Sequence, residues 1–249
     1  NASQLPNQGV NAFEEQLEII LEEKVAVCSF TFGLPDVYIV KELKKRDVKV
    51  IGTATTVSEA VQLEDAGVDY IVAQGSEAGG HRGTFSTTVG EPLIGTIALV
   101  PQMINQVKTP VIAAGGIING RGVMAALALG AVGAQLGSVF LTCYESGAAE
   151  VYKDKVIESD EESAILTKAF SGKLARGINN SRTALKIPAY PIQNNLTQSL
   201  RAQAKAEANP EMMSLWAGQG LGMINNKYSV EELLTQLVTE LKASYREMI

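Results

Sequence analysis

The sequence is poor in the residue types that build metal sites, disulfide frameworks and nucleic-acid surfaces. Its 249 residues include one histidine, two cysteines and one tryptophan. A lone imidazole and two distant cysteines, Cys28 and Cys143, do not make a zinc ligand set, so we expect no metal site. Because both cysteines lie within apolar runs, we expect buried free thiols rather than a disulfide or a nucleophile.

Charge and apolar runs narrow the class of protein further. The net charge is −6, which argues against nucleic acid or an anionic membrane as a partner. No apolar stretch is long enough to span a bilayer. The first residues do not form a signal-peptide pattern, so we expect a cytoplasmic protein, and a homo-oligomer is compatible with the sequence.

What the sequence does contain is a repeat of short apolar runs and helical patterns. Five continuously apolar runs predict strands covered on both faces, as in a parallel sheet: Val25–Phe30, Lys49–Thr55, Asp69–Gln74, Pro110–Ala114 and Ala131–Gly137. Helical patterns alternate with them: Gly9–Lys24, Asp36–Arg46, Ser58–Ala66, Thr96–Val107 and Gly120–Leu129. Ser58 is a candidate N-cap, and Gly67 and Gly130 stand where C′ glycines belong. The pattern predicts consecutive βα units of an α/β fold.

The C-terminal part of the chain has a different character. It predicts, in order, a helix, a further strand and a turn-rich loop: Glu145–Asp160, Ala164–Ala169 and Ser171–Asn180. Two or three further helices follow, of which the last is Ser229–Arg246. We therefore divide the chain into residues 1–145, which carry the βα units, and residues 146–249, a mainly helical segment that closes the fold and covers its functional end.

The single histidine lies in a glycine-rich insertion, QGSEAGGHRG, that follows the third apolar run. Loops at the carboxyl ends of parallel strands carry function in α/β folds, so we interpret His81 as a general base, against the alternative of a structural or exposed histidine. Gln74 ends the strand, and its amide is placed to bond a planar heterocycle. Glu77 and Arg82 are candidates to tune the imidazole or to pair with each other.

Two glycine motifs follow the next two strands. Ile112–Ile117 reads IAAGGI, and Ala134–Phe140 reads AQLGSVF, each just before a helical pattern. Neighbouring helix N-termini can bind a phosphate, and we favour such a site over plain tight turns. The sequence has no G-x-S-x-G elbow and no G-x-G-x-x-G fingerprint after a strand, so a serine hydrolase and a Rossmann dinucleotide site are not supported.

Several motifs, in family order, resemble the nitronate monooxygenases, formerly called 2-nitropropane dioxygenases. They are QGSEAGGHRG, PVIAAGGIINGRG, LGAVGAQLGSVF, FSGKLARGINN, YPIQNNLT and LWAGQG. The resemblance implies an FMN-dependent (β/α)8 TIM-barrel enzyme, of which the five predicted strands would be the fourth to the eighth. It implies roles in binding FMN for Gln74, Gly79, Gly116, Gln135, Leu136, Gly137 and Ser138, and it makes His81 the catalytic base. Family members usually read Met-Gly-Thr where this chain has Leu-Gly-Ser, and serine keeps the hydroxyl.

The resemblance also implies a reaction. Alkyl nitronates such as propionate 3-nitronate would be oxidised by oxygen to carbonyl compounds and nitrite, and His81 would remove the α-proton when the substrate is a neutral nitroalkane. One alternative is a flavin-dependent enoyl-acyl-carrier-protein reductase, since those enzymes share the AGGH and AAGGI motifs. Another is a truncated, non-catalytic module that binds flavin or phosphate. Trp216 and Tyr190 are expected in the core rather than in the substrate pocket.

The sequence departs from the family at its start. Family members begin with three further βα units that contact the flavin, and the resemblance finds no counterpart of them here. A barrel without those strands would expose two sheet edges. We therefore expect that this segment, as an isolated monomer, neither binds FMN tightly nor turns over substrate.

Overall fold

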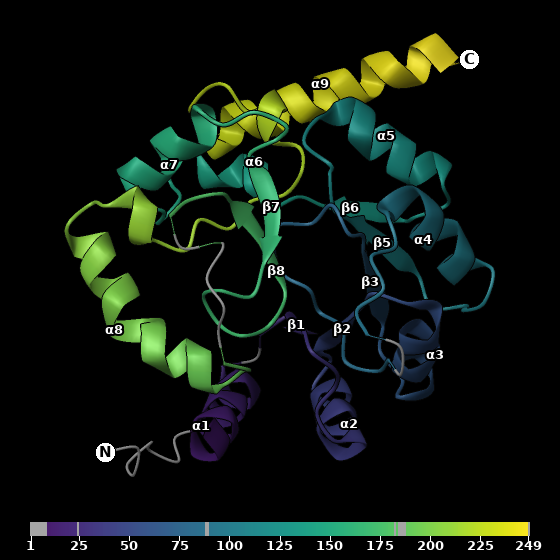
Figure 1. Ribbon diagram of the computed structural model, residues 1–249. Coiled ribbons are helices and arrows are strands. Elements are labelled where there is room, and N and C mark those ends of the chain that lie inside the picture. Colours follow the sequence, from purple (N-terminus) through teal and green to yellow (C-terminus); the bar gives the residue numbers. More distant parts are fainter. Residues whose placement is uncertain (1–8, 24, 88–89, 182, 184–187, 249) are drawn as a thin grey trace.

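The structure, a computed structural model, describes residues 9–23, 25–87, 90–181, 183 and 188–248 (Figure 1). Its centre is a five-stranded parallel sheet with the strand order β1-β2-β3-β5-β6. The strands are β1 (Val27–Phe30), β2 (Lys49–Ala54), β3 (Tyr70–Gln74), β5 (Val111–Ala114) and β6 (Gly133–Gln135). Each lies inside one of the five predicted apolar runs, so those predictions are confirmed.

The register of the sheet brings the carboxyl ends of all five strands to one edge. Near that edge the paired residues are Phe30 with Gly52, Ala54 with Ala73, Gln74 with Ala114, and Ala114 with Gln135. Loops that follow these strands therefore meet at the same end of the molecule.

Helices alternate with the strands and lie along the outer side of the sheet, as Figure 1 shows. They are α1 (Gly9–Glu22), α2 (Val37–Lys45), α3 (Val57–Asp65), α4 (Thr96–Ile104) and α5 (Gly120–Ala128). The prediction of Ser58 as an N-cap is wrong. Thr56 has an extended backbone and its hydroxyl accepts the Glu59 N–H, so α3 begins directly after it. Gly67 and Gly130 do follow helix C-caps with positive φ values of 85° and 95°.

A second, antiparallel sheet lies beside the first. It has the order β4-β8-β7, with β4 (Gly80–His81), β7 (Ala164–Thr167) and β8 (Ala175–Ile178). The strand predicted at Ala164–Ala169 is confirmed, but the loop predicted at Ser171–Asn180 is wrong in part because it contains β8. Every residue of β8 is buried, since this strand pairs with β7 on one side and with β4 on the other.

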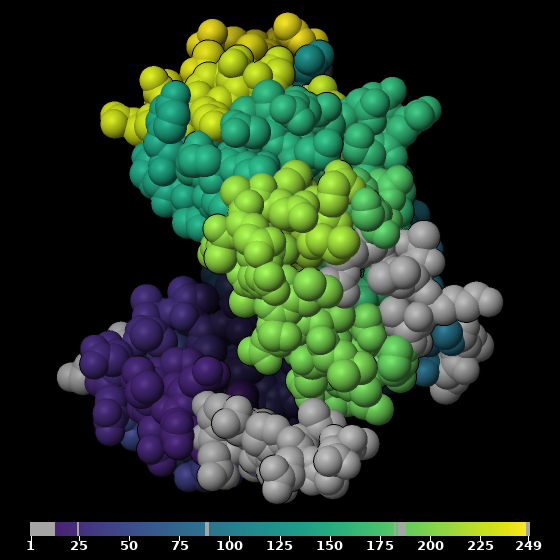
Figure 2. All heavy atoms as spheres, turned by 60° about the vertical axis from the view of Figure 1, so that its left-hand side comes forward, coloured from purple at the N-terminus to yellow at the C-terminus, as the bar shows by residue number. Residues whose placement is uncertain are grey.

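A short helix, α6 (Ser138–Leu141), follows β6. The remaining helices lie in the C-terminal part: α7 (Glu150–Ile157), α8 (Ile192–Ala206) and α9 (Val230–Met248), with 3-10 turns η1 (Pro210–Met212) and η2 (Leu221–Met223). The predicted final helix is confirmed, and the helix predicted at Glu145–Asp160 is shorter, as α7. Figure 2 shows a hollow between the purple N-terminal elements and the green α8.

Two apolar cores hold these parts together. One lies between the parallel sheet and its outer helices and includes Leu43, Leu63 and Leu99. The other lies under the C-terminal helices but includes Ile118 and Val139 from the first part of the chain. Cys28 and Cys143 are buried free thiols, as predicted. The division at residue 145 stays a prediction, with β4 and β8 pairing across it.

The fold class is confirmed as α/β with a parallel sheet. Sequential strand order with a helix after each strand is the arrangement of consecutive units in a (β/α)8 barrel. Within the described residues, β1 and β6 are the two edges of the sheet. No helix of the described part of the chain is long and apolar enough to cross a membrane.

Candidate active site

A cavity of about 290 Å³ opens where the carboxyl ends of the strands meet. The loop after β1 contributes Thr31 and β2 contributes Thr53, whose hydroxyl oxygens lie 3.4 Å apart. Gln74 at the end of β3 and Gln135 at the end of β6 add two amides. Among the described residues that line the cavity, none has an ionisable side chain. The described lining therefore offers a ligand hydroxyl, amide and backbone groups but no charged side chain.

Three of the predicted glycines lie together on this lining: Gly79, Gly116 and Gly137. Gly116 has a φ of +71°, which favours glycine. At Gly79 a Cβ would lie 2.6 Å from the carbonyl carbon of Ala217, so glycine lets two loops pack closely. At Gly137 a Cβ would meet nothing within 4 Å. The absent side chain at Gly137 thus leaves open the kind of space that a ligand needs.

The N-terminus of α5 is less available to an anion than the sequence suggests. Asn119 Oδ1 accepts the Gly122 N–H at 2.9 Å, and Glu240 Oε2, from α9, accepts the Gly120 N–H at 2.8 Å. Protein groups therefore occupy two of the N–H groups that a phosphate would use. A phosphate near Gly116 would depend on the loop before α5 rather than on the helix end.

The end of β6 keeps a suitable hydroxyl. Ser138 is buried, lines the cavity, and its Oγ accepts the Gly218 N–H at 2.8 Å. Accepting this bond leaves the hydroxyl able to donate its own proton to a ligand. Leu136, in contrast, is not among the lining residues and packs against both apolar cores.

Gln74 holds the histidine loop in place. Its Nε2 donates to the carbonyl of His81 at 3.0 Å, and its Oε1 accepts the Gly83 N–H at 2.8 Å. The predicted bond from this amide to a planar heterocycle would have to use the second proton on Nε2. The amide's main contribution is therefore to fix the backbone on both sides of Arg82.

His81 lies beside the cavity, with its ring in an aromatic cluster. The imidazole centroid is 5.2 Å from the ring of Trp216, which lines the cavity, and 6.0 Å from the ring of Phe32. Its Nε2 is 2.6 Å from Oγ of Ser171, in the turn between β7 and β8. The pairing of β4 with β8 holds His81 opposite Ala175 and so brings Ser171 to the ring.

The environment of His81 favours its neutral form. Burial lowers the pKa of His81, and the positive charges of Lys173 and Arg201 lower it further. The described groups that shift this pKa include no carboxylate. A neutral imidazole near pH 7 is the form that can accept a proton.

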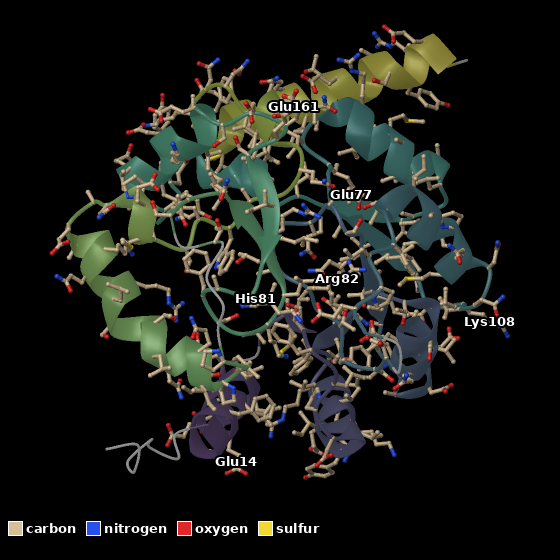
Figure 3. The ribbon with its side chains drawn as sticks, viewed as in Figure 1. Glu14, Glu77, His81, Arg82, Lys108 and Glu161 are labelled. Carbon is tan, nitrogen blue, oxygen red and sulfur yellow. The ribbon has the colours of Figure 1, made fainter. Side chains whose placement is uncertain are left out.

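Glu77 and Arg82 do not tune the imidazole by contact, and neither bonds the other. The Glu77 carboxylate accepts the N–H and the hydroxyl of Thr96 at 2.9 Å and so caps α4. The buried Arg82 guanidinium donates to the carbonyls of Gln74, Thr55 and Pro92. In Figure 3, Glu77, His81 and Arg82 lie toward the middle of the molecule, whereas Glu14 and Lys108 lie at its edge.

With this geometry in view, comparison with known proteins gives a consistent result. A family model described as nitronate monooxygenase matches residues 2–240. A protein from Bacillus subtilis (strain 168), described as a probable nitronate monooxygenase, is 49% identical over 234 residues, which are 92% of this chain and 67% of that protein. The chain belongs to the nitronate monooxygenase family.

Other relatives and solved structures resemble this chain over most of its length. A probable nitronate monooxygenase from Staphylococcus aureus (strain MRSA252) is 51% identical over 83% of this chain and 60% of its own length. The nitroalkane oxidase from Streptomyces ansochromogenes superposes with a TM-score of 0.91 at 36% identity, covering 96% of this chain and 70% of that one. FabK from Thermotoga maritima superposes with a TM-score of 0.81 at 30% identity, covering 94% and 74%. This family is one of oxidoreductase enzymes, and the chain spans about two thirds of the length of these curated relatives.

The sequence does not indicate several residues of this candidate site. Ser171 lies 90 positions from His81, and no spacing rule links the two. Arg176 donates two bonds to the carbonyl of Ser76 and thereby anchors the start of the histidine loop. Core packing for Trp216 and Tyr190 was a wrong prediction, because Trp216 lines the cavity and Tyr190 is 51% exposed. The FSGKLARG and LWAGQG motifs were the available signals, but neither motif indicated a contact.

Proposed function

We propose that this chain carries the catalytic part of an FMN-dependent enzyme that oxidises alkyl nitronates with oxygen to carbonyl compounds and nitrite. Family membership supports the reaction class. The observation that carries the proposal is the half-buried imidazole of His81, whose pKa is lowered by burial, held by Ser171 beside a cavity whose described lining has no charged side chain.

The residues present fit a flavin. The cavity combines the apolar walls Val72 and Trp216 with glycines and hydroxyls, which suits a flat ring system that ends in a polar phosphate. Gln74, Gly79 and Gly80 would hold the ring, and Gly116, Gln135, Gly137 and Ser138 would hold the phosphate. When bound, the flavin supplies the exchange of electrons between substrate and oxygen.

The chain itself would contribute a proton acceptor, one nitrogen of the His81 imidazole. The Ser171 Oγ also lies 3.4 Å from the carbonyl of Lys173, to which it can donate. If the hydroxyl donates there, it accepts from His81 Nε2–H, and the imidazole lone pair is on Nδ1. We assign Nδ1 as the atom that takes the α-proton of a neutral nitroalkane. A preformed nitronate has already lost that proton and needs His81 only for orientation.

The test is a pair of assays on the purified protein, which also decide the expectation that this segment, as an isolated monomer, neither binds FMN tightly nor turns over substrate. The visible absorbance of the preparation reports bound flavin. Release of nitrite from a nitronate and oxygen without NADH supports the proposal. Consumption of NADH with an enoyl thioester, and no nitrite, would instead establish the enoyl-reductase alternative. Bound flavin with neither activity would indicate a non-catalytic binding module.

We also propose the partners, the location and the oligomeric state. The partners are a small nitronate and oxygen, with no nucleic acid and no membrane, which fits the acidic net charge of −6. A cytoplasmic location and a homo-oligomer remain predictions that fractionation and light scattering would test.

A further inference from the structure

Trp216 is the only tryptophan in the sequence, and it lines the cavity beside His81. The ring centroids of these two residues are 5.2 Å apart, with an angle of 57° between the ring planes. The indole is half-buried, whereas its chain neighbours Leu215 and Ala217 are buried. A substrate that reaches the imidazole from the cavity therefore comes close to the indole.

Hydrogen bonds fix the main chain that carries this indole. An isolated antiparallel bridge joins Trp216 to Gly177 of β8. The Tyr152 hydroxyl donates to the carbonyl of Trp216, and two residues further on the Gly218 N–H donates to Ser138 Oγ at 2.8 Å. The main chain at Trp216 cannot shift without breaking bonds to several different elements, and an unmade hydrogen bond is costly where the groups are buried.

The indole also packs closely against its surroundings. Its ring meets that of Phe170 edge to face, with the centroids 5.3 Å apart, and Phe170 is 2% exposed. Gly177 lies so near that a Cβ added there would be 3.0 Å from Cε3 of the indole. Close-packed groups have little room to move aside. The indole is therefore a fixed part of the cavity wall.

Among the described residues that line the cavity, Trp216 has the largest side chain and the only aromatic ring. The other apolar side chains there are those of Val72, Ala78, Ala114, Ile117, Ile118 and Leu141. Because the indole lies next to the imidazole, it bounds the space in which a carbon atom could approach His81. The size of that space depends on this one ring more than on any other side chain of the described lining.

We propose that Trp216 is a specificity-determining residue whose indole limits the size of the alkyl group that a nitronate can carry at its reacting carbon. The site should therefore accept small nitronates and discriminate against those whose reacting carbon belongs to a ring. This inference rests on the proposed function for the identity of the reacting group. It does not depend on turnover, because a non-reacting anion of the same shape meets the same wall.

The first experiment compares the nitronates of nitroethane and nitrocyclohexane on the flavin-loaded enzyme. Trp216→Ala should raise the ratio of kcat/KM for the cyclohexyl substrate to kcat/KM for the ethyl substrate about 10- to 100-fold, the range over which apolar pockets discriminate by size. Both substrates are measured on one preparation, so any loss of flavin or of active enzyme cancels in the ratio. Trp216→Leu and Trp216→Phe remove fewer atoms and should raise the ratio by successively smaller factors.

A second aromatic residue provides the matched control. Tyr144 is 64% exposed and is not among the described lining residues, so Tyr144→Ala removes a ring away from the cavity. Its substrate ratio should equal that of the parent. If Trp216→Ala does not fold, Trp216→Leu serves in the same comparison, because it also opens space beside His81.

The second experiment measures binding without chemistry. A carboxylate has the planar, two-oxygen anion of a nitronate and does not react, so propionate and cyclohexanecarboxylate represent the two substrates. Calorimetry in saturating FMN gives the dissociation constant of each. Trp216→Ala should shift the ratio of the two constants at least about tenfold in favour of cyclohexanecarboxylate, the effect of admitting the larger group. Tyr144→Ala should keep the ratio of the parent.

The two experiments separate the size limit from the reaction. A changed carboxylate preference in Trp216→Ala, without nitrite release from either nitronate in any variant, would support the size limit and overturn the proposed reaction. Nitrite release with the same substrate ratio in Trp216→Ala as in the parent, or an unchanged carboxylate preference, would overturn the role of Trp216 and leave the reaction intact.

Discussion

Two regions of the molecule meet at His81, and they contribute differently to the site. The parallel sheet supplies a cavity lined by hydroxyls and glycines, such as Thr53 and Gly137, with no charge among its described residues. The turn between β7 and β8 supplies the hydroxyl of Ser171 and the ammonium of Lys173. This difference indicates that one segment provides the space for a ligand and another segment sets the charge around His81.

Specific contacts keep these two regions in register. β4 pairs with β8, the guanidinium of Arg176 bonds the carbonyl of Ser76, and the Gly218 N–H donates to Ser138. Each contact joins a loop of the parallel sheet to the C-terminal part. Mutations can therefore change four features separately: the candidate base, the contacts between the two regions, the cavity lining and the charge around His81. We expect effects of decreasing size in that order.

The largest effect is expected at the base. His81→Asn removes the proton acceptor, so kcat/KM for a neutral nitroalkane should fall about 10²- to 10⁴-fold. The same variant should lose far less with a preformed nitronate, which has no proton to give. Steady-state assays with nitroethane and its nitronate measure both. Equal losses on the two substrates would show that His81 orients the substrate instead of removing its proton.

The second-largest effect is expected at the hydrogen bonds that connect the two regions. Arg176 is buried, and its Nε and Nη2 donate to the Ser76 carbonyl at 3.0 and 2.9 Å, while Nη1 donates to the Ala164 carbonyl at 3.1 Å. Arg176→Met removes these charge-assisted bonds and should lower the free energy of unfolding by about 2–3 kcal/mol, measured by urea denaturation. The exposed Arg121 is the control, and Arg121→Met should change it by less than about 0.5 kcal/mol. Similar values for both variants would contradict the anchoring role of Arg176.

A smaller effect is expected in the cavity. At both Gly137 and Gly133 an added Cβ meets no atom within 4 Å, but only Gly137 lines the cavity. Gly137→Ala should therefore keep the protein folded and weaken flavin binding about tenfold, through one misplaced methyl group. Gly133→Ala should leave flavin affinity unchanged. Fluorescence titration with FMN measures both, and equal affinities would place the phosphate elsewhere.

The two regions also differ in how far the sequence predicts them. The five strands of the parallel sheet could be found because the sheet is covered on both faces, which requires continuous apolar runs. Val50 and Ile71, for example, are fully buried. The glycines after β5 and β6 could be found because they end those runs. The groups that accept the N–H bonds of the following helix could not be found. Glu240 of α9, for example, accepts the N–H of Gly120 from 120 residues away.

The C-terminal region was harder to predict because its structure depends on distant partners. β8 is a strand only because β4 and β7 flank it, and its sequence, ARGI, has no strand periodicity. The contacts of Ser171 and Trp216 with His81 likewise join segments that no local pattern relates. Sequence reasoning therefore pointed to the candidate base and to the glycines that line the cavity, but not to the groups that set the charge around His81.

The smallest effect concerns pH. Burial and two cations lower the pKa of His81 below the ordinary value of about 6.5. The folded protein then resists a proton that the unfolded chain accepts. This histidine therefore costs stability as the pH falls through about 6.5, the cost is complete below the folded-state pKa, and it is absent at higher pH.

The same shift predicts the acid limb of the pH–rate profile. Neutral His81 should persist to a lower pH than a free histidine, so kcat/KM for a neutral nitroalkane should hold until the pH drops below that of ordinary imidazole titration. Lys173→Gln removes one of the two cations, so the pKa should rise and the limb should move to higher pH by a fraction of a unit. Lys168→Gln changes an equal charge that Glu91 already neutralises and should leave the limb in place. If the limb stays fixed in Lys173→Gln, the charge of the β7–β8 turn does not reach the imidazole, and the contrast between an uncharged cavity and a charged C-terminal side has no consequence for the base.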